Sequence, residues 1–267
     1  MKVEGNLLKM ATRYHGDGVD YYLTLGAEQV YVNEWIGRRL TLRYGHQINC
    51  IRCGRKTSKS FFQGYCYPCF VGAPETEPCV IHPEKCQAHE GISRDMEWSK
   101  RHCLIDHYVY LAVSSGLKVG VTRHTQIPTR WIDQGASRAV RLARTPNRYL
   151  AGLIEVDLKQ HLADKTNWQR MLKGQLERQV DLKEEKQKAS ALLRADLREY
   201  LIDEDALTTI RYPLENHPLK VKSLSFDKVE QYTGTLAGIK GQYLIFDTGQ
   251  VFNVRKHNGY LVRIETD

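Results

Sequence analysis

Alternating apolar and polar residues at both ends of the chain predict β-strands. Near the N-terminus, "VDYYLTL" (19–25) and "RRLTLRYG" (38–45) are rich in β-branched and aromatic residues, and glycine-containing turns separate them. The same kind of pattern returns from Lys220 to the C-terminus. The sequence therefore predicts one small β-unit over residues 1–49 and another over residues 213–267.

The two terminal segments also repeat one another. "YLTLGAEQVYVNEWIGRRLTL" (22–42) corresponds to "YLIFDTGQVFNVRKHNGYLVRI" (243–264), because both begin with Tyr-Leu, carry Gln-Val-aromatic at the same offset, and then reach a glycine. This self-similarity predicts an internal duplication. Two arrangements are consistent with it: the copies form separate small barrels, or they pair with each other in one structure.

The middle of the chain predicts a mixture of strands and helices. "HYVYLAVSSGLKVGVT" (107–122) consists of two apolar runs joined by Ser-Ser-Gly, which indicates a β-hairpin. Residues 128–145 are expected to form one helix that ends before Pro146. A strand, "YLAGLIEV" (149–156), and a helix, "DLKQHLADKTNWQRML" (157–172), are expected after it.

A charged helix is predicted within residues 181–212. Asp181 followed by Glu184 has the form of a capping box, and the amphipathic run after it extends to about Leu201. We interpret this helix as a solvated one laid across the body. These elements predict an α+β fold, in which a small α/β core is flanked by two small β-rich, barrel-like units and a charged helix.

Composition narrows the class of protein. The 267 residues are 42% apolar, which suffices for a packed core, and no run reaches the roughly 20 apolar residues of a membrane span. The N-terminus lacks the apolar core of a signal peptide, so we expect a cytoplasmic protein that does not contact a membrane. The net charge of +8 and the pI near 9.0 favour a polyanionic partner, and we expect nucleic acid, either DNA or RNA.

Seven cysteines in a reducing compartment indicate metal binding or catalysis rather than disulfides. Cys50, Cys53, Cys66 and Cys69 form two CxxC pairs, and Gly54 supplies the permissive backbone that a tight turn around a metal favours. Four thiolates complete a tetrahedral Zn²⁺ site without an open position, so we predict a structural zinc. An iron–sulfur cluster and reduced free thiols are the alternatives.

A second group of cysteines and histidines follows within the predicted cysteine module, residues 50–106. Cys79, Cys86 and Cys103 are the predicted thiolate ligands of a second zinc, with His89 as the fourth ligand. The two cysteines and two histidines between 79 and 89 also have ligand-like spacing, and that set leaves Cys103 unused. Buried cysteines that pack as small apolar side chains are the remaining interpretation.

The residues after the cysteines carry another ordered pattern. Tyr110 lies on the first predicted strand of the hairpin, "KVGVTR" (118–123) forms the second, and Arg130, Glu155 and Asn167 follow in that order. This order resembles the GIY-YIG nuclease domain, which has a tyrosine strand, a second strand ending in glycine, a helix with an arginine, a helix-borne glutamate and a later asparagine. "KVGVT" is similar to the relatives that carry Lys-Ile-Gly-x-Thr in place of Tyr-Ile-Gly.

The resemblance implies a role for each of these residues in a core over residues 107–180. Tyr110 would orient or deprotonate a water, and Arg130 would bind the phosphate. Lys118 stands where the second tyrosine is expected and would contact the phosphate. Glu155 would hold one Mg²⁺ or Mn²⁺ ion. In the same scheme, the architecture of the core would be supported by Asn167.

Five longer stretches are similar to the bacterial family called domain of unknown function 2797. They are "GYCYPC" (64–69), "KVGVTR" (118–123), "RWIDQGA" (130–136), "HLADKTNW" (161–168) and "GIKGQYLIFD" (238–247). This resemblance covers most of the chain. It implies no established activity.

Three functions are consistent with these patterns. The first is a zinc-containing, metal-dependent phosphodiesterase acting on nucleic acid, and the second is a nucleic-acid-binding protein whose core does not cleave. The third is an adaptor whose β-units bind protein partners. Lys118 in place of a tyrosine and Gln134 in place of a frequent histidine favour binding over cleavage, because a lysine needs a strongly lowered pKa to act as a base.

Overall fold

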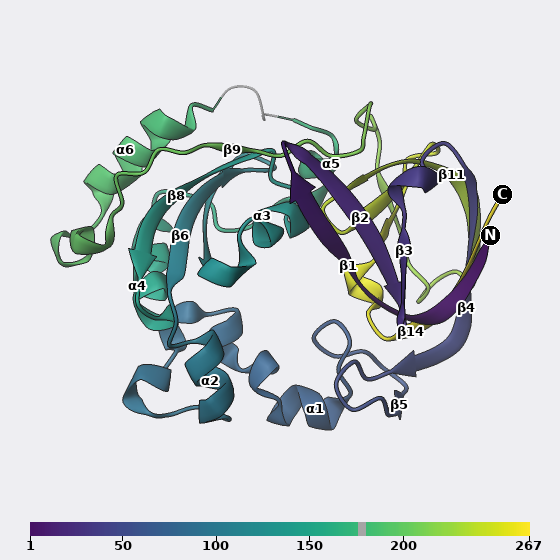
Figure 1. The fold of residues 1–267 in the computed structure, drawn as a ribbon, viewed down its shortest axis with the longest axis horizontal. Coiled ribbons are helices and arrows are strands. Elements are labelled where there is room, and N and C mark those ends of the chain that lie inside the picture. Colours follow the sequence, from purple (N-terminus) through teal and green to yellow (C-terminus); the bar gives the residue numbers. More distant parts are fainter. Residues whose placement is uncertain (176–179) are drawn as a thin grey trace. The chain divides into compact units, whose positions relative to one another are not determined.

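The computed structural model describes residues 1–175 and 180–267 and has the predicted mixed α+β composition (Figure 1). It divides into two compact units. The first unit, termed the β-unit, combines Met1–Val71 with Arg211–Asp267, and the second, termed the core unit, is Gly72–Ile210. The expected cysteine module, 50–106, is therefore shared between the two units.

The β-unit is built on a ten-stranded mixed sheet. Its path is β10-β13-β12-β11-β4-β14-β1-β2-β3, with β5 paired to β4, and the described strands do not close into a barrel. The strands are β1 (Lys2–His15), β2 (Gly18–Leu25), β3 (Glu28–Tyr31), β4 (Arg39–Asn49), β5 (Lys56–Thr57), β10 (Lys222–Leu224), β11 (Gln231–Lys240), β12 (Tyr243–Phe246), β13 (Gln250–Asn253) and β14 (Tyr260–Thr266). The 3₁₀ turns are η1 (Asn33–Trp35) and η8 (Arg255–His257), and α1 (Tyr67–Gly72) follows the second CxxC pair.

The order of strands shows that the two terminal segments are structural repeats. Each repeat consists of three strands, a 3₁₀ turn and a fourth strand: β1 to β4 with η1, and β11 to β14 with η8. From β13 to β3 the path is the same when read from either end, since the third, second and first strands of one repeat are followed by the fourth strand of the other. Leu42 and Ile264 face each other at the centre.

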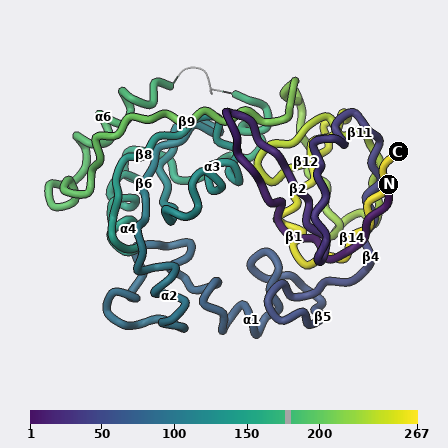
Figure 2. Tube along the Cα trace, viewed as in Figure 1, coloured from purple at the N-terminus to yellow at the C-terminus, as the bar shows by residue number. Residues whose placement is uncertain are grey.

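Backbone contacts repeat with the strands. Gly37 N donates to Leu236 O at 2.8 Å, and Gly259 N donates to Leu7 O at 2.7 Å, so each glycine bonds to the first strand of the other repeat. Both glycines have φ of 85°, a left-handed conformation that glycine tolerates without a steric cost. Because β4 and β14 pair with each other and with the opposite repeat, neither terminal segment forms a separate barrel. Figure 2 shows the purple N-terminal and yellow C-terminal strands side by side.

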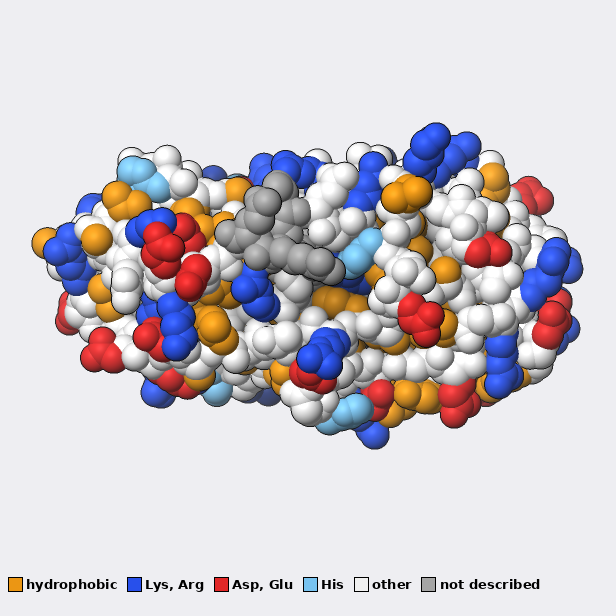
Figure 3. All heavy atoms as spheres, turned by 90° about the horizontal axis from the view of Figure 1, so that it is seen from above, with side chains coloured by type: hydrophobic (Ala, Val, Ile, Leu, Met, Phe, Trp, Pro, Cys, Tyr) orange, Lys and Arg blue, Asp and Glu red, His pale blue; other side chains and the backbone are white. Residues whose placement is uncertain are grey.

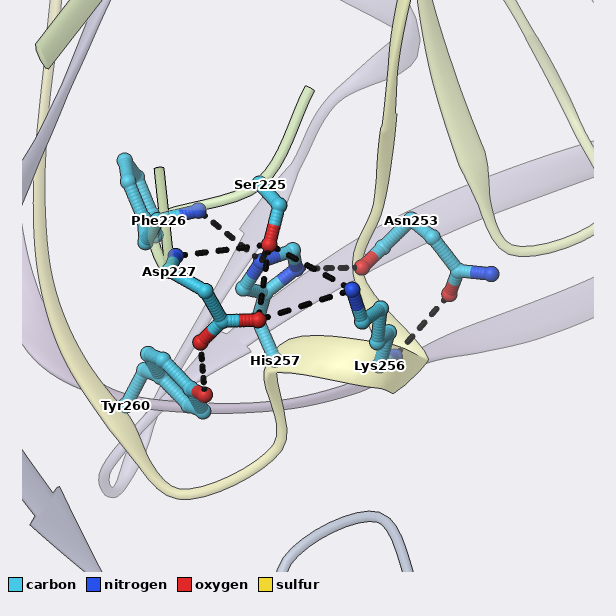
Figure 4. A network of polar contacts seen from close by, with 7 residues as sticks. All are labelled: Ser225, Phe226, Asp227, Asn253, Lys256, His257 and Tyr260. Carbon is cyan, nitrogen blue, oxygen red and sulfur yellow. Dashed lines mark hydrogen bonds and ion pairs between the residues drawn. The ribbon is translucent and has the colours of Figure 1, made fainter. Parts of the chain in front are cut away.

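A polar network anchors the loop that precedes β11 (Figure 4). Asp227 accepts hydrogen bonds from Tyr260 Oη at 2.7 Å and from Ser225 Oγ at 2.9 Å. His257 is fully buried, and its Nε2 accepts from Phe226 N at 3.2 Å. His257 Nδ1 lies 2.7 Å from Asn253 O, so both ring nitrogens are used in holding the loop.

The core unit contains a four-stranded antiparallel sheet in the order β7-β6-β8-β9. Its strands are β6 (His107–Val113), β7 (Leu117–Arg123), β8 (Arg138–Thr145) and β9 (Thr208–Thr209). Its helices are α2 (Met96–His102), α3 (Thr129–Asp133), α4 (Arg148–Leu158), α5 (Trp168–Leu172) and α6 (Leu182–Leu192). Its 3₁₀ turns are η2 (Pro74–Thr76), η3 (Pro78–Val80), η4 (Pro83–Lys85), η5 (Ala88–Glu90), η6 (His124–Gln126) and η7 (Ala195–Tyr200).

The hairpin predicted over 107–122 is present as β6 and β7, but the prediction of one helix over 128–145 is wrong. The chain forms the short helix α3 and then the strand β8. Gly135, with φ of 68°, ends the helical turn. β8 then pairs with β6 along its length, so tertiary pairing overrides the helix propensity of its alanine, leucine and arginine residues.

The strand predicted over 149–156 is also wrong, since α4 occupies this segment. Asn147 caps the helix, with its side-chain oxygen accepting from Leu150 N at 3.0 Å. Ala151, Ile154 and Leu158 are buried at helical spacing and belong to one apolar core with the sheet.

The helix predicted over 157–172 is reduced to α5, and the charged helix ends earlier than expected. Asp181 caps α6 as predicted, accepting from Lys183 N at 2.9 Å, but the α-helix stops at Leu192 and is followed by η7. Among the described residues, no helix combines the length and apolar character needed to cross a membrane.

Candidate metal centres and candidate active site

The first cysteine group has the geometry of a tetrahedral metal site. The sulfur atoms of Cys50, Cys53, Cys66 and Cys69 all lie within 4.8 Å of one another, and Cys53 Sγ is 3.8 Å from Cys66 Sγ. A tetrahedral Zn²⁺ about 2.3 Å from four sulfurs places them about 3.8 Å apart. The four cysteines predicted from their spacing therefore fit zinc without rearrangement of the chain.

The local backbone explains this convergence. Cys50 N donates to Arg55 O, and Gly54 N donates to Cys50 O, both at 2.9 Å, which closes a tight turn around the first pair. Gly54 has φ of 72°, as its predicted role in the turn requires. At the second pair, Phe70 N donates to Cys66 O at 2.8 Å, so the start of α1 forms the corresponding turn.

The segment with these cysteines, Cys50–Val71, is termed the ribbon, and it is attached to the C-terminal repeat. Asn49, directly before it, donates from N to Gly259 O and from Nδ2 to Gly54 O, each at 2.8 Å. Asn258 Nδ2 donates to Gln63 O at 3.0 Å. The ribbon is thus held by hydrogen bonds to the sheet as well as by its thiolates.

The second cysteine group lies in the core unit and has three members. The sulfur atoms of Cys79, Cys86 and Cys103 are within 4.8 Å of one another, and all three residues are buried. Hydrogen bonds from the Cys79 and Cys86 thiols lower the pKa of Cys103, which favours a thiolate. His89, the predicted fourth ligand, is not in the group, because its ring stacks on Tyr149 with centroids 4.4 Å apart.

Two contacts fix this second group to α4. Arg148, which is buried at the start of the helix, donates from Nη1 to Cys79 Sγ at 3.5 Å and from Nη2 to His102 O at 3.1 Å. Further along α4, Gly152 lies against Glu84 of η4. The helix that carries Glu155 is therefore positioned in part by the residues around the second cysteine group.

The hairpin residues predicted as catalytic meet at Gln134. Tyr110 Oη donates to Gln134 Oε1 at 2.8 Å, and Lys118 Nζ donates to the same oxygen. Tyr110 is completely buried and Lys118 is 3% exposed. Gln134, noted in the sequence only as a departure from the nuclease pattern, is thus the residue that joins the two.

Gly120 leaves room for the aromatic ring of the neighbouring strand. Gly120 pairs with Tyr110 across the hairpin, and a Cβ on Gly120 would lie 2.7 Å from Tyr110 Oη. The space above this glycine is filled by the tyrosine ring.

Burial and nearby charges change the pKa of Lys118. Desolvation, together with the positive charge of Arg130, lowers the pKa of the Lys118 ammonium to about 7, while Glu155 and Asp164 act in the opposite direction. Desolvation also raises the pKa of Tyr110, and Arg130 opposes that change. These effects require Arg130 and Glu155 to lie near the Tyr110–Lys118 pair.

Glu155 is buried and has a cationic neighbour. Desolvation raises the pKa of the Glu155 carboxyl, and Lys159 Nζ, 3.4 Å from Glu155 Oε2, opposes this. Lys159 also pairs with Asp164 Oδ2 at 3.3 Å. The sequence interpretation missed Lys159 and Asp164, although the i,i+4 spacing of Glu155 and Lys159 would have indicated the pair if the segment had been recognised as a helix.

Asn167 lies outside this polar cluster. Its side chain caps α5 by accepting from Arg170 N at 3.1 Å, and its own N donates to Ser115 Oγ in the hairpin loop at 2.9 Å. These contacts are architectural. Within the described ranges, grouped metal-ligand atoms occur at the two cysteine groups, and Glu155 is in neither of them.

The positive charge of the chain is concentrated in the β-unit. This unit contains 18 lysine and arginine residues against 11 aspartate and glutamate residues, whereas the core unit contains 21 and 20. Residues 35–74 contain seven lysine and arginine residues and no acidic residue. On the face shown in Figure 3, basic and acidic side chains are interspersed, so the excess does not form one continuous patch there.

Comparison with known proteins identifies the family but no activity. No curated protein and no solved structure matches the chain. The model of the family described as "Protein of unknown function (DUF2797)" matches residues 37–262, which include the ribbon, the hairpin, α4 and most of the C-terminal repeat. The chain therefore belongs to the DUF2797 family.

Proposed function

We propose that the protein binds nucleic acid through its zinc ribbon. The observation that carries this proposal is the absence of acidic residues from 35–74. Four basic residues of this stretch are exposed on the ribbon: Arg52, Arg55, Lys56 and Lys59. Phosphate contacts from such residues supply most of the non-specific affinity of proteins for nucleic acid.

Aromatic side chains near these cations favour a single-stranded ligand. A hollow of about 270 Å³ is lined by Tyr44, His46 and Lys56 together with three neighbouring residues, and the Tyr44 and His46 rings lie 5.1 Å apart. On the ribbon itself, Tyr67 is 59% exposed. Unpaired bases stack on exposed rings while the backbone follows nearby cations, an arrangement that is tolerant of sequence.

A second candidate activity is phosphodiester hydrolysis in the core unit, and the Tyr110–Gln134–Lys118 contacts favour it. The order of elements (two hairpin strands, a helix with Arg130, a third strand and a helix with Glu155) supports the GIY-YIG-like interpretation. The sequence objection was that lysine is normally too basic to accept a proton. A pKa near 7 weakens that objection, because about half of Lys118 is then neutral at neutral pH.

Each group in this cluster has a distinct task in such a reaction. Neutral Lys118 accepts a proton from the attacking water, and Tyr110 orients that water through its hydroxyl. Arg130 stabilises the negative charge that develops on the phosphate. Glu155 would hold Mg²⁺ or Mn²⁺, which polarises the phosphoryl oxygen when bound.

Fluorescence anisotropy with labelled single strands and duplexes tests the binding proposal. The Lys56→Ala/Lys59→Ala variant should bind single strands more weakly than the unmodified protein, with a salt slope smaller by about 1.4, since each lost contact to a single strand removes roughly 0.7. The control is Lys165→Ala/Lys183→Ala, which removes two exposed lysines from the core unit. An equal loss of affinity in both double variants would show that the ribbon is not the binding surface.

The same titrations separate nucleic-acid binding from the adaptor hypothesis. Affinity that does not depend on salt, or no binding at low salt, would exclude phosphate contacts. A role for the β-unit in binding protein partners would then be the better interpretation.

A further inference from the structure

The second cysteine group borders a cavity that the proposed function does not use. The cavity has a volume of about 280 Å³, and Cys79, Cys86 and Cys103 are all part of its lining. Glu77 and Ser99 line it as well. Three buried thiols at the wall of a cavity differ from the first cysteine group, where four thiolates surround the metal position.

The chain supplies three ligands here, while zinc in proteins takes four. Within the described residues no further cysteine, histidine or carboxylate joins the three sulfurs. The three histidines nearby in sequence have other contacts. His89 stacks on Tyr149, His102 Nδ1 lies 2.8 Å from Trp98 O, and His82 pairs with Glu84.

We infer that Cys79, Cys86 and Cys103 form a metal centre whose fourth ligand is an exogenous small thiol that enters the adjoining cavity. A structural zinc site is closed by protein ligands, whereas a site with three protein ligands keeps one position for an external molecule. The open position belongs on the cavity side, since all three cysteines reach that wall.

Arg148 offsets part of the negative charge of such a centre. An exogenous thiol binds as the thiolate and releases its proton to solvent, so four thiolates around one divalent cation leave a net charge of −2. Arg148 is buried, and its Nη1 donates to Cys79 Sγ at 3.5 Å, which places a compensating positive charge beside the sulfurs. With Arg148 the sum is −1, and an ammonium group on the ligand would neutralise the remainder in a surrounding that includes Ala88, Trp98 and Leu104.

The cavity also indicates the class of thiol. Zinc that has three thiolates accepts a fourth sulfur, as it does in Cys₄ sites. Glu77 Oε1 accepts from Arg94 N at 2.8 Å, but Glu77 Oε2 is buried and has no hydrogen-bond partner in the described part of the chain. A ligand ammonium group would satisfy this oxygen, so the geometry fits a small aminothiol, and the volume admits a molecule of that size.

Cobalt(II) substitution in the full chain provides the test, because cobalt absorbs visible light when bound to thiolates. The protein should hold two metal ions per chain. Cysteamine and propane-1-thiol are compared as probes, since they differ in carrying an ammonium or a methyl group. We expect either thiol to change the cobalt spectrum and cysteamine to do so at a concentration at least tenfold lower. The first cysteine group is an internal control, because its four ligands leave no position for a thiol.

Two variants locate the effect. Glu77→Gln should keep both metals and bind cysteamine about tenfold more weakly, with propane-1-thiol unchanged. His89→Ala should have the cobalt spectrum of the unmodified protein. A changed spectrum in His89→Ala would make that histidine the fourth ligand and overturn the inference. So would one metal per chain, or a spectrum that neither thiol alters.

Discussion

Gly152 of α4 lies so close to Glu84 of η4 that a Cβ on the glycine would be 2.2 Å from the Glu84 amide nitrogen. The backbone of the helix that carries Glu155 therefore packs directly on the backbone of η4, next to the second cysteine group. A side chain at this position would have to push the two elements apart. The contact adds backbone packing to the Arg148 hydrogen bonds that hold α4 against the residues around the second cysteine group.

Gly152→Ala is expected to destabilise the core unit by about 1–3 kcal/mol, as overpacking of a well-packed contact does. Urea denaturation followed by tryptophan fluorescence measures the effect. Gly72→Ala is the matched control, because a Cβ there would meet nothing within 4 Å and should change stability by less than about 0.5 kcal/mol. Equal stability of the two variants would contradict the close contact.

Removal of a ribbon ligand should unfold the ribbon. Cys50→Ser leaves three thiolates around the metal, and the segment 50–71 has few buried apolar side chains to replace the lost metal–ligand bond. We expect loss of one zinc per chain and a large decrease in soluble protein. Elemental analysis of protein purified without chelators checks this, and fewer than one zinc in the unmodified protein would exclude the site.

The sequence predicted correctly those features that depend on interactions between residues close together in the chain. The strands of the β-unit were predictable because their apolar residues alternate with period two. The hairpin was predictable because two short apolar runs flank Ser-Ser-Gly. The four ribbon cysteines were predictable because a CxxC turn places both thiols on one metal by local geometry alone.

Long-range effects account for the errors. "ASRAVRLAR" (136–144) has residues of high helix propensity, yet it forms β8 because β6 offers it a partner strand. Conversely, Ile154 and Val156 favour strands, and α4 forms there because Asn147 caps it and its apolar face is buried. The predicted ligand His89 stacks on Tyr149, sixty residues later in the chain, and the spacing of cysteines and histidines does not reveal this contact.

Acid should destabilise the β-unit through His257. Burial lowers the pKa of this imidazole to about 4, below its ordinary value of 6.5. Between these two values the unfolded chain binds a proton that the folded chain does not, so stability decreases as pH falls from about 6.5 to about 4 and is unaffected above this window. The full contribution is about 3 kcal/mol.

His257→Phe should remove this dependence, since phenylalanine keeps the ring and does not titrate. The free energy of unfolding, measured by urea denaturation at several pH values, should depend less on pH in the variant between pH 4 and 6.5. The variant also loses the hydrogen bonds to Phe226 and Asn253, so it should be less stable at pH 8. An unchanged pH slope would show that the histidine is accessible to protons in the folded protein.

If the core unit cleaves phosphodiesters, the rate should rise with pH through about 7. Lys118 is the reason, because only its neutral form accepts a proton, and its pKa is lowered to about 7. Lys118→Arg keeps a positive charge that does not titrate in this range and should reduce cleavage by about 10²-fold or more at every pH. A rate in the unmodified protein that is constant from pH 6 to 8 would exclude Lys118 as the base.

Glu155→Gln separates cleavage from binding in the core unit. The amide keeps the size of the side chain and removes the charge that would hold Mg²⁺ or Mn²⁺, so cleavage should be abolished. Affinity for nucleic acid should stay the same or increase, because one negative charge leaves the phosphate site. Gln134→Leu provides a comparison: it removes the acceptor shared by Tyr110 and Lys118 and should slow cleavage without eliminating metal binding.

The assay for this last prediction is time-resolved cleavage of single-stranded, duplex and branched substrates with Mg²⁺ or Mn²⁺ at fixed low salt. Cleavage that survives Glu155→Gln would come from a contaminant or from a different site. Consistent absence of cleavage in the unmodified protein, with binding intact, would leave the Tyr110–Gln134–Lys118 cluster without a hydrolytic role. Nucleic-acid binding through the ribbon would then stand alone, because the ribbon variants Lys56→Ala and Lys59→Ala test it without reference to the core unit.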